Sequence, residues 1–140
     1  MKKFGVVITF EPLVYKVVNV TEEDIDDIMC SAFEGGIGYW ACLDNTSEEF
    51  ENAPDYESYS ETCTKILLKG GAVKLIDNED WKLYTLNLNR LLYGIVRWVE
   101  IGGDVYGAVR KDGSLDCGNI DSECADCIIQ LALFGEIVYG

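Results

Sequence analysis

Three segments of the chain have the start and stop signals of helices, and these signals constrain the fold more than any other feature. Each segment follows a residue whose side chain can accept a hydrogen bond from a first-turn amide. These residues are Thr21, Asn87 and Asp121. Each segment ends in glycine, which readily adopts the left-handed conformation that closes a helix. These glycines are Gly35-Gly36, Gly102-Gly103 and Gly135. The sequence therefore predicts three glycine-terminated helices.

The first of these helices has the clearest pattern. Thr21 and Asp24 have the spacing of a capping box. An apolar stripe follows at helical spacing: Ile25, Ile28, Met29, Ala32 and Phe33. The motif EGGIGYW (34–40) comes after this helix, whereas a phosphate-binding loop precedes one and uses its N-terminal amides. We interpret the motif as a helix end, with a left-handed Gly35. A strand IGYWACL should follow, with Tyr39 and Trp40 on opposite faces.

The other segments have the short, β-branched runs of strands. Phe4 to Val20 indicates a bent strand or hairpin around Glu11-Pro12. AVKLID and WKLYTLN indicate a hairpin around the turn 78–80, and TCTKILLKGG is typical of either a strand or a short helix. The polar segment 44–61 is predicted to be a long acidic loop. We expect a single compact α+β domain over 1–140, with an antiparallel sheet of short strands and about three helices.

The chain has no histidine, and this absence excludes several kinds of active site. Ser-His and Cys-His nucleophile pairs, histidine zinc sites and imidazole acid–base catalysis all require that residue. We therefore expect a protein that is not an enzyme and that uses no metal or cofactor. No apolar run approaches the roughly 20 residues that span a bilayer, so we expect no membrane contact.

Two weaker motifs have simpler structural explanations. Cys124 and Cys127 form one CxxC, but its neighbours Asp121, Glu123 and Asp126 oppose thiolate formation, which favours helix packing over zinc or redox chemistry. The six cysteines are expected to be free thiols, as in a reducing cytosol. The oxygen-rich run from Asp116 to Asp121 resembles part of a calcium loop, but the downstream glutamate is missing, which favours a solvated surface.

Charge is the most unusual property of the sequence. The net charge is −14, and the 48 residues from Val17 to Thr64 hold 13 acidic residues and no lysine or arginine. One acidic cluster lies in the first predicted helix: Glu22, Glu23, Asp24, Asp26, Asp27 and Glu34. The second lies in the predicted loop: Asp44, Glu48, Glu49, Glu51, Asp55, Glu57 and Glu61. Such a surface repels nucleic acid and attracts the basic proteins that hold it. The alternative is that net negative charge only keeps the protein soluble.

At TEEDIDDIMCSAFEGGIGYW, and again at GNIDSECADCIIQLALFGEIVYG, the chain resembles a family of small proteins encoded by phages and prophages of Gram-positive gut bacteria. The likeness covers most of the length and is weakest in the acidic loop. It implies an accessory gene of a mobile element, expressed in the cytoplasm of the host bacterial cell. Small acidic accessory proteins of phages are often inhibitors of host defence, including anti-CRISPR proteins. The resemblance implies no catalytic residues.

These observations predict an anti-CRISPR-like inhibitor that binds a host defence effector through a phosphate-mimicking surface, without contacting nucleic acid itself. The expected contact residues lie in both acidic clusters: Glu22, Glu23, Asp26, Asp27, Glu48, Glu49, Glu51, Asp55 and Glu57. One alternative is a sponge for a nucleotide defence signal, in which arginines clamp phosphates and tryptophans stack on bases. Its residues would be Arg90, Arg97, Arg110, Trp40, Trp81 and Trp98. Further alternatives are a metal-dependent hydrolase and a virion or scaffold component that forms a homo-oligomer.

Overall fold

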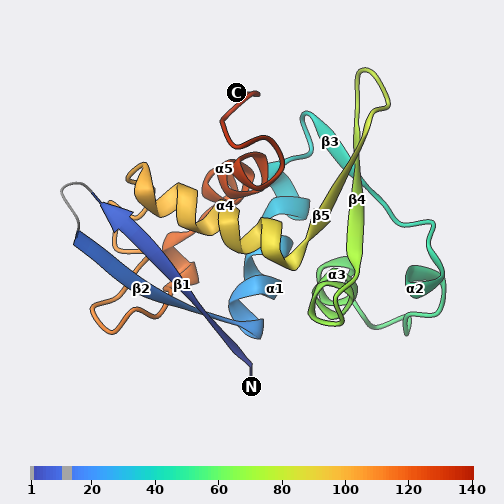
Figure 1. Cartoon of the computed structure of the whole chain (residues 1–140). Coiled ribbons are helices and arrows are strands. Elements are labelled where there is room, and N and C mark those ends of the chain that lie inside the picture. Colours follow the sequence, from blue (N-terminus) through green and yellow to red (C-terminus); the bar gives the residue numbers. More distant parts are fainter. Residues whose placement is uncertain (1, 11–13) are drawn as a thin grey trace.

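Two small antiparallel sheets and five α-helices form the α+β architecture of the described part of the chain (Figure 1). The structure is a computed structural model that describes residues 2–10 and 14–140. The helices are α1 (Glu22–Ser31), α2 (Glu48–Glu51), α3 (Tyr59–Leu68), α4 (Leu88–Glu100) and α5 (Ser122–Phe134). A π-helical turn, η1 (Ala32–Gly36), and a 3-10 turn, η2 (Cys117–Asn119), complete the helical elements. The predicted α+β fold class is confirmed.

The predicted hairpins are present, but they belong to two sheets and not to one. Strands β1 (Lys3–Phe10) and β2 (Val14–Thr21) pair antiparallel, with Lys3 opposite Thr21; their predicted turn at Glu11-Pro12 lies outside the described residues. Strands β3 (Ala41–Asp44), β4 (Ala72–Asp77) and β5 (Leu83–Asn87) form the second sheet in the order β3-β4-β5. The β4–β5 pair is the hairpin that was predicted around residues 78–80.

The predicted caps at the starts of α1, α4 and α5 are confirmed. Thr21 and Asp24 form a reciprocal capping box at α1. The Asn87 side chain accepts a hydrogen bond of 2.8 Å from the amide of Arg90, and that of Asp121 accepts one of 2.9 Å from the amide of Cys124. Each cap satisfies an amide that has no partner within its own helix, which explains why these positions start helices.

The end of α1 differs from the prediction. The helix continues into η1, and Gly35 has φ 168°, which is extended backbone and not the predicted left-handed conformation. The neighbouring Gly36 is required by close approach: a Cβ there would lie 2.7 Å from the carbonyl oxygen of Ser122. The chain then turns, and β3 begins only at Ala41. The predicted strand IGYWACL is present only from Ala41 onward, and the prediction that Tyr39 and Trp40 lie on its opposite faces is wrong, because both precede the strand.

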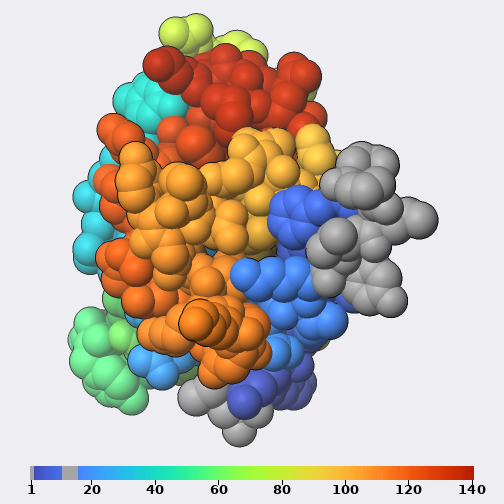
Figure 2. All heavy atoms as spheres, turned by 90° about the vertical axis from the view of Figure 1, so that its left-hand side faces the viewer, coloured from blue at the N-terminus to red at the C-terminus, as the bar shows by residue number. Residues whose placement is uncertain are grey.

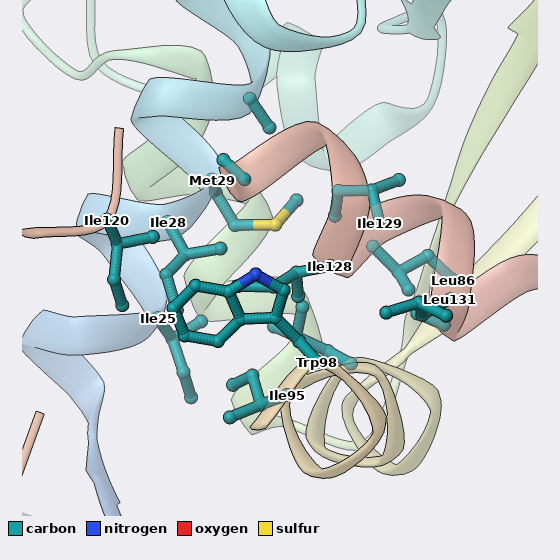
Figure 3. Close-up of a cluster of buried hydrophobic side chains, with 14 of the residues drawn as sticks. Ile25, Ile28, Met29, Leu86, Ile95, Trp98, Ile120, Ile128, Ile129 and Leu131 are labelled. Atoms are coloured by element: carbon teal, nitrogen blue, oxygen red, sulfur yellow. The ribbon is translucent and has the colours of Figure 1, made fainter. Parts of the chain in front are cut away.

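The hydrophobic core lies where α1, α4 and α5 meet. The Trp98 ring of α4 reaches toward Ile25, Ile28 and Met29 of α1, and Ile128 of α5 completes the contact (Figure 3). All of these side chains are buried. The hairpin β1–β2 packs on α4 through β1. Figure 2 shows the face of the molecule on which this hairpin lies beside the end of α4 and the segment that follows it. The core thus fixes α1, and with it the first acidic cluster.

Candidate functional site

Helix α3 separates the two acidic clusters. It contacts α1 on one side and α2 on the other, as Figure 1 shows. The predicted acidic loop at 44–61 is only partly irregular, because it contains α2 and the first turn of α3. The segment TCTKILLKGG, for which strand and helix were both open, is helical up to Leu68. Elements that carry acidic residues of the two clusters therefore flank α3 on both sides.

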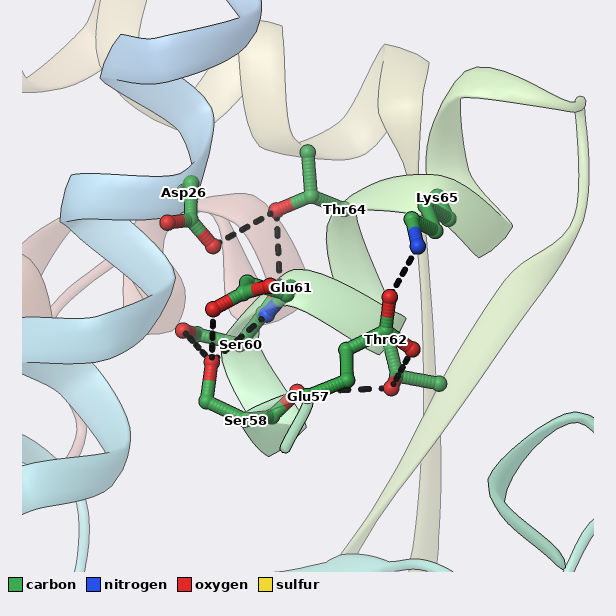
Figure 4. Close-up of polar contacts among 8 residues, drawn as sticks. All are labelled: Asp26, Glu57, Ser58, Ser60, Glu61, Thr62, Thr64 and Lys65. Carbon is green, nitrogen blue, oxygen red and sulfur yellow. Dashed lines mark hydrogen bonds and ion pairs between the residues drawn. The ribbon is translucent and has the colours of Figure 1, made fainter. Parts of the chain in front are cut away.

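Hydroxyl groups on α3 and just before it hold three of the carboxylates (Figure 4). The Thr64 hydroxyl donates to the Ser60 carbonyl at 2.8 Å and also lies within hydrogen-bond distance, 3.4 Å, of the Asp26 carboxylate of α1. Thr62 donates to Glu57 at 2.8 Å. The Ser58 hydroxyl donates to Glu61 at 3.2 Å. Lys65 also forms an ion pair with Glu57, whose side chain is only 4% exposed. Asp26 and Glu57 are therefore tied into the fold and are less free to contact a partner than predicted.

The other seven predicted contact residues stand at the surface in two groups. Glu22, Glu23 and Asp27 belong to α1, with Glu23 and Asp27 exposed and Glu22 half-buried. The remaining four lie in or near α2 and are all exposed: Glu48, Glu49, Glu51 and Asp55. At 1.5 Å per residue, the ten residues of α1 form a helix about 15 Å long, so its first turn lies about 10 Å from its last. The structure brings the end of α1, and not its start, toward the loop.

The carboxylates of α1 are close enough to repel one another. Partial burial raises the pKa of Asp27, and the negative charges of Glu23, Asp26 and Asp24 raise it further. The loop has a different environment on its α3 side, where Lys65 and Lys69 line a hollow together with Glu48 and Glu49. Hydrogen bonds with its own backbone and with the Ser47 side chain lower the pKa of Glu49, and the positive charge of Lys69 lowers it further. This hollow thus brings two lysines close to Glu48 and Glu49, whereas no carboxylate of α1 lines it.

A groove of about 560 Å³ lies on the side of the loop that faces α1. Its walls come from the end of α1 and η1 and from residues 50–62. Three aromatic side chains line it, Phe33, Phe50 and Tyr59, and the carboxylates of Glu34 and Asp55 are exposed at its edge. We call this feature the α1–loop groove. It joins members of both acidic clusters around an aromatic surface.

The convergence of Phe33, Phe50 and Tyr59 in one groove and the role of the α3 hydroxyl groups were not predicted from the sequence. The hydroxyls have a visible signal, since SYSETCT (58–64) has a polar residue at nearly every position. The groove has no such local signal, because Phe33 was assigned to the core stripe and Phe50 and Tyr59 to the loop. Only the packing of α1 against α3 brings them together.

The other motifs found in the sequence have structural roles. All six cysteines are free thiols. Burial, followed by a hydrogen bond to Asp121, raises the pKa of Cys124 to about 11, and burial also raises that of Cys127. Asp116 accepts a hydrogen bond from the amide of Gly118, as Asp121 does from that of Cys124. Over residues 2–10 and 14–140, no group of three or more metal-ligating side chains is arranged to hold an ion.

The residues of the nucleotide-binding alternative do not converge. Trp40 and Trp98 are each only 3% exposed, so they pack in the core and present no face to a base. Arg97 pairs with Glu100 at 3.0 Å, and Arg110 hydrogen-bonds the carbonyl of Leu115 at 2.8 Å. Trp81 is exposed at the tip of the β4–β5 hairpin. These positions are spread over several elements and line no common cavity among those found in the described chain.

A buried carboxylate, Asp126, anchors the segment that was expected to be a strand. Its two oxygens accept hydrogen bonds from the Tyr39 hydroxyl at 2.6 Å and the Trp40 ring nitrogen at 2.8 Å. The side-chain amide of Gln130 also donates to Asp126, at 2.9 Å. The side-chain oxygen of Gln130 accepts hydrogen bonds from the backbone amides of Val138 and Tyr139. Burial and the Asp126 contact raise the pKa of Tyr39 to about 12. Because all these groups satisfy each other, we assign them to the fold.

Comparison of the chain with protein-family models, with curated proteins and with solved structures finds no significant match. In the described residues, no helix has the length and apolar character that crossing a membrane requires.

Proposed function

We propose that this protein is a non-enzymatic inhibitor of a bacterial defence effector, of the kind that mobile genetic elements carry. It binds the lysine- and arginine-rich surface on which the effector, such as a CRISPR nuclease, holds nucleic acid. The observation that supports this proposal is the exposure of Glu48, Glu49, Glu51 and Asp55 in a sequence stretch, Val17 to Thr64, that has no lysine or arginine. Lys65 and Lys69 lie beside Glu48 and Glu49 on the α3 side only, and Glu51 and Asp55 do not line that hollow. Carboxylates placed this way attract a cationic surface and speed association with it.

The internal hydrogen bonds of the region support the same proposal. Asp26, Glu57 and Glu61 accept hydrogen bonds from hydroxyls on or beside α3, which restrain the start of α3 and its contact with α1. A binding surface that is already ordered loses less conformational entropy on association. Glu48, Glu49 and Glu51 belong to α2, which packs on α3, so these exposed carboxylates do not extend from a free loop.

The test is competition with DNA for a panel of purified CRISPR nucleases loaded with guide RNA. We expect wild-type protein to block target binding by at least one of them at about 50 mM NaCl and to lose most of this effect at about 500 mM. Substitution of Glu48, Glu49 and Glu51 by lysine should weaken inhibition on the order of tenfold or more, because attraction is replaced by repulsion. Inhibition that is unchanged in this variant at low salt would contradict the proposal.

A matched control reverses three exposed acidic residues outside the region: Glu79, Glu123 and Glu136. This variant has the same net charge as the first one. We expect it to weaken inhibition far less, since screening limits charges that are remote from the contact to small effects at moderate salt. Equal losses in both variants would mean that net charge, and not the acidic region, is responsible.

A further inference from the structure

We propose that the α1–loop groove binds an arginine side chain of a protein partner. This inference rests on the proposed function in one respect, namely that the partner presents a basic surface. It adds the place where one side chain of that surface is recognised and the kind of side chain that fits. Three properties of the groove carry it: its aromatic walls, its carboxylates and its size.

The aromatic walls are held in a defined arrangement. The rings of Phe50 and Tyr59 meet edge to face, with centroids 6.0 Å apart and an interplanar angle of 71°. The Tyr59 hydroxyl accepts a hydrogen bond of 3.0 Å from the side chain of Asn45, which fixes the outer end of that ring. Phe33 approaches from η1 and is half-buried. A planar cation that enters the groove meets these aromatic rings without having to order them first.

The charges of the groove select a cation. Glu34 comes from η1 and Asp55 from the loop, both are exposed, and neither forms an ion pair within the described chain. Glu57 also lines the groove, but Lys65 and Thr62 already neutralise and hold it. The described lining contains no lysine or arginine. A phosphate would be repelled here, and a purely apolar side chain would gain nothing from the two carboxylates.

The chemistry distinguishes arginine from lysine. A guanidinium group is planar and weakly hydrated, so it stacks on aromatic rings and still donates hydrogen bonds at its edge to a carboxylate. An ammonium group is a compact, strongly hydrated charge and gains less from the rings. The groove volume of about 560 Å³ is within the usual range for small-ligand sites and admits one long side chain with its backbone.

The probes for this proposal are two blocked peptides of equal charge, tetra-arginine and tetra-lysine, titrated into the whole protein by NMR at about 20 mM NaCl. We expect tetra-arginine to bind about threefold more tightly, which is the effect of one exposed cation–π contact. The ring protons of Phe33, Phe50 and Tyr59 should shift with the arginine peptide. Equal affinities of the two peptides, or shifts confined to other aromatic residues, would overturn the proposal.

A charge-matched pair of variants separates the groove from general attraction. Glu34→Gln with Asp55→Asn should reduce tetra-arginine affinity about fivefold and reduce, without abolishing, the preference over tetra-lysine, because the aromatic rings remain. Glu79→Gln with Asp80→Asn removes the same charge at the β4–β5 turn and should leave the preference intact. If both variants lose the same affinity, the groove does not recognise arginine. An intact preference in a protein that inhibits no nuclease supports the groove and contradicts only the proposed function.

Discussion

Trp81 combines two unfavourable properties in one residue. Within the described ranges it is the one non-glycine residue with positive φ, at 62°, and its side chain is 77% exposed. The turn around it is imposed by a neighbour: the carboxylate of Asp77 accepts hydrogen bonds from the amides of Glu79, at 2.8 Å, and Asp80, at 3.3 Å. The Tyr139 hydroxyl donates to the other oxygen of Asp77. Trp81 therefore adopts a conformation that its own side chain disfavours.

Replacing Trp81 by asparagine should stabilise the protein. Asparagine tolerates the left-handed conformation, and little packing is lost, so we expect the free energy of unfolding to rise by about 0.5–1 kcal/mol. Trp81→Phe is the control, because phenylalanine keeps the backbone strain and should leave stability nearly unchanged. Urea unfolding of the three proteins measures the difference. A Trp81→Asn variant that is less stable than wild type would show that the exposed ring makes a stabilising contact.

At the scale of elements, the contact between α4 and α5 depends on a position without a side chain. Gly94 lies within α4 and is buried. A Cβ at this position would lie 2.5 Å from the carbonyl oxygen of Ile128 and 2.8 Å from the Cβ of Ala132, both in α5. The two helices therefore approach more closely than any larger residue would permit. The same contact positions Trp98, four residues further along α4, against α1.

We expect Gly94→Ala to destabilise the protein by about 1–3 kcal/mol, the usual cost of overpacking, although alanine is the better helix former. Gly38→Ala is the matched control, because a Cβ there meets no heavy atom within 4 Å and Gly38 has no positive φ. Its stability should stay within about 0.5 kcal/mol of wild type. Thermal or urea unfolding measures the stability of both variants. A Gly94→Ala variant as stable as the control would mean that α4 and α5 can move apart at little cost in free energy.

At the scale of the whole molecule, the charge is weakly compensated. The chain has 25 acidic and 11 basic residues, and the described part forms three ion pairs. Two of the pairs, Arg97 with Glu100 and Arg110 with Asp116, lie outside the acidic region. Repulsion among like charges opposes the compact state, and it is reduced by salt.

Salt should therefore stabilise this protein. Raising NaCl from about 20 mM to about 500 mM should increase the melting temperature by a few degrees, which corresponds to about 1 kcal/mol. Neutralising Glu23 and Asp27 in the variant Glu23→Gln/Asp27→Asn should reduce this increase, because it removes two charges from the crowded face of α1. Differential scanning calorimetry at both salt concentrations provides the measurement. A melting temperature that does not respond to salt would show that the carboxylates do not repel one another appreciably.

The sequence by itself determined the features that depend on near neighbours. Thr21, Asn87 and Asp121 start helices because each side chain bonds an amide three residues away, and such bonds need no other part of the chain. The β4–β5 hairpin and the charge of the region between Val17 and Thr64 are equally local. The two-sheet arrangement was not predicted, since local signals do not specify which strands pair.

Only the tertiary structure decided which polar groups are free and which are engaged. Asp126 reaches Tyr39 across 87 positions of the chain, and Asp26 reaches Thr64 across 38. The contact with Thr64 withdrew Asp26 from the predicted contact surface, and the packing of α1 against α3 placed Glu34 and Asp55 at one groove. The physical reason is that burial and packing, not spacing along the chain, decide which side chains meet. The sequence thus determines how many carboxylates the protein has, and the fold determines which of them are engaged in structural contacts and which are exposed.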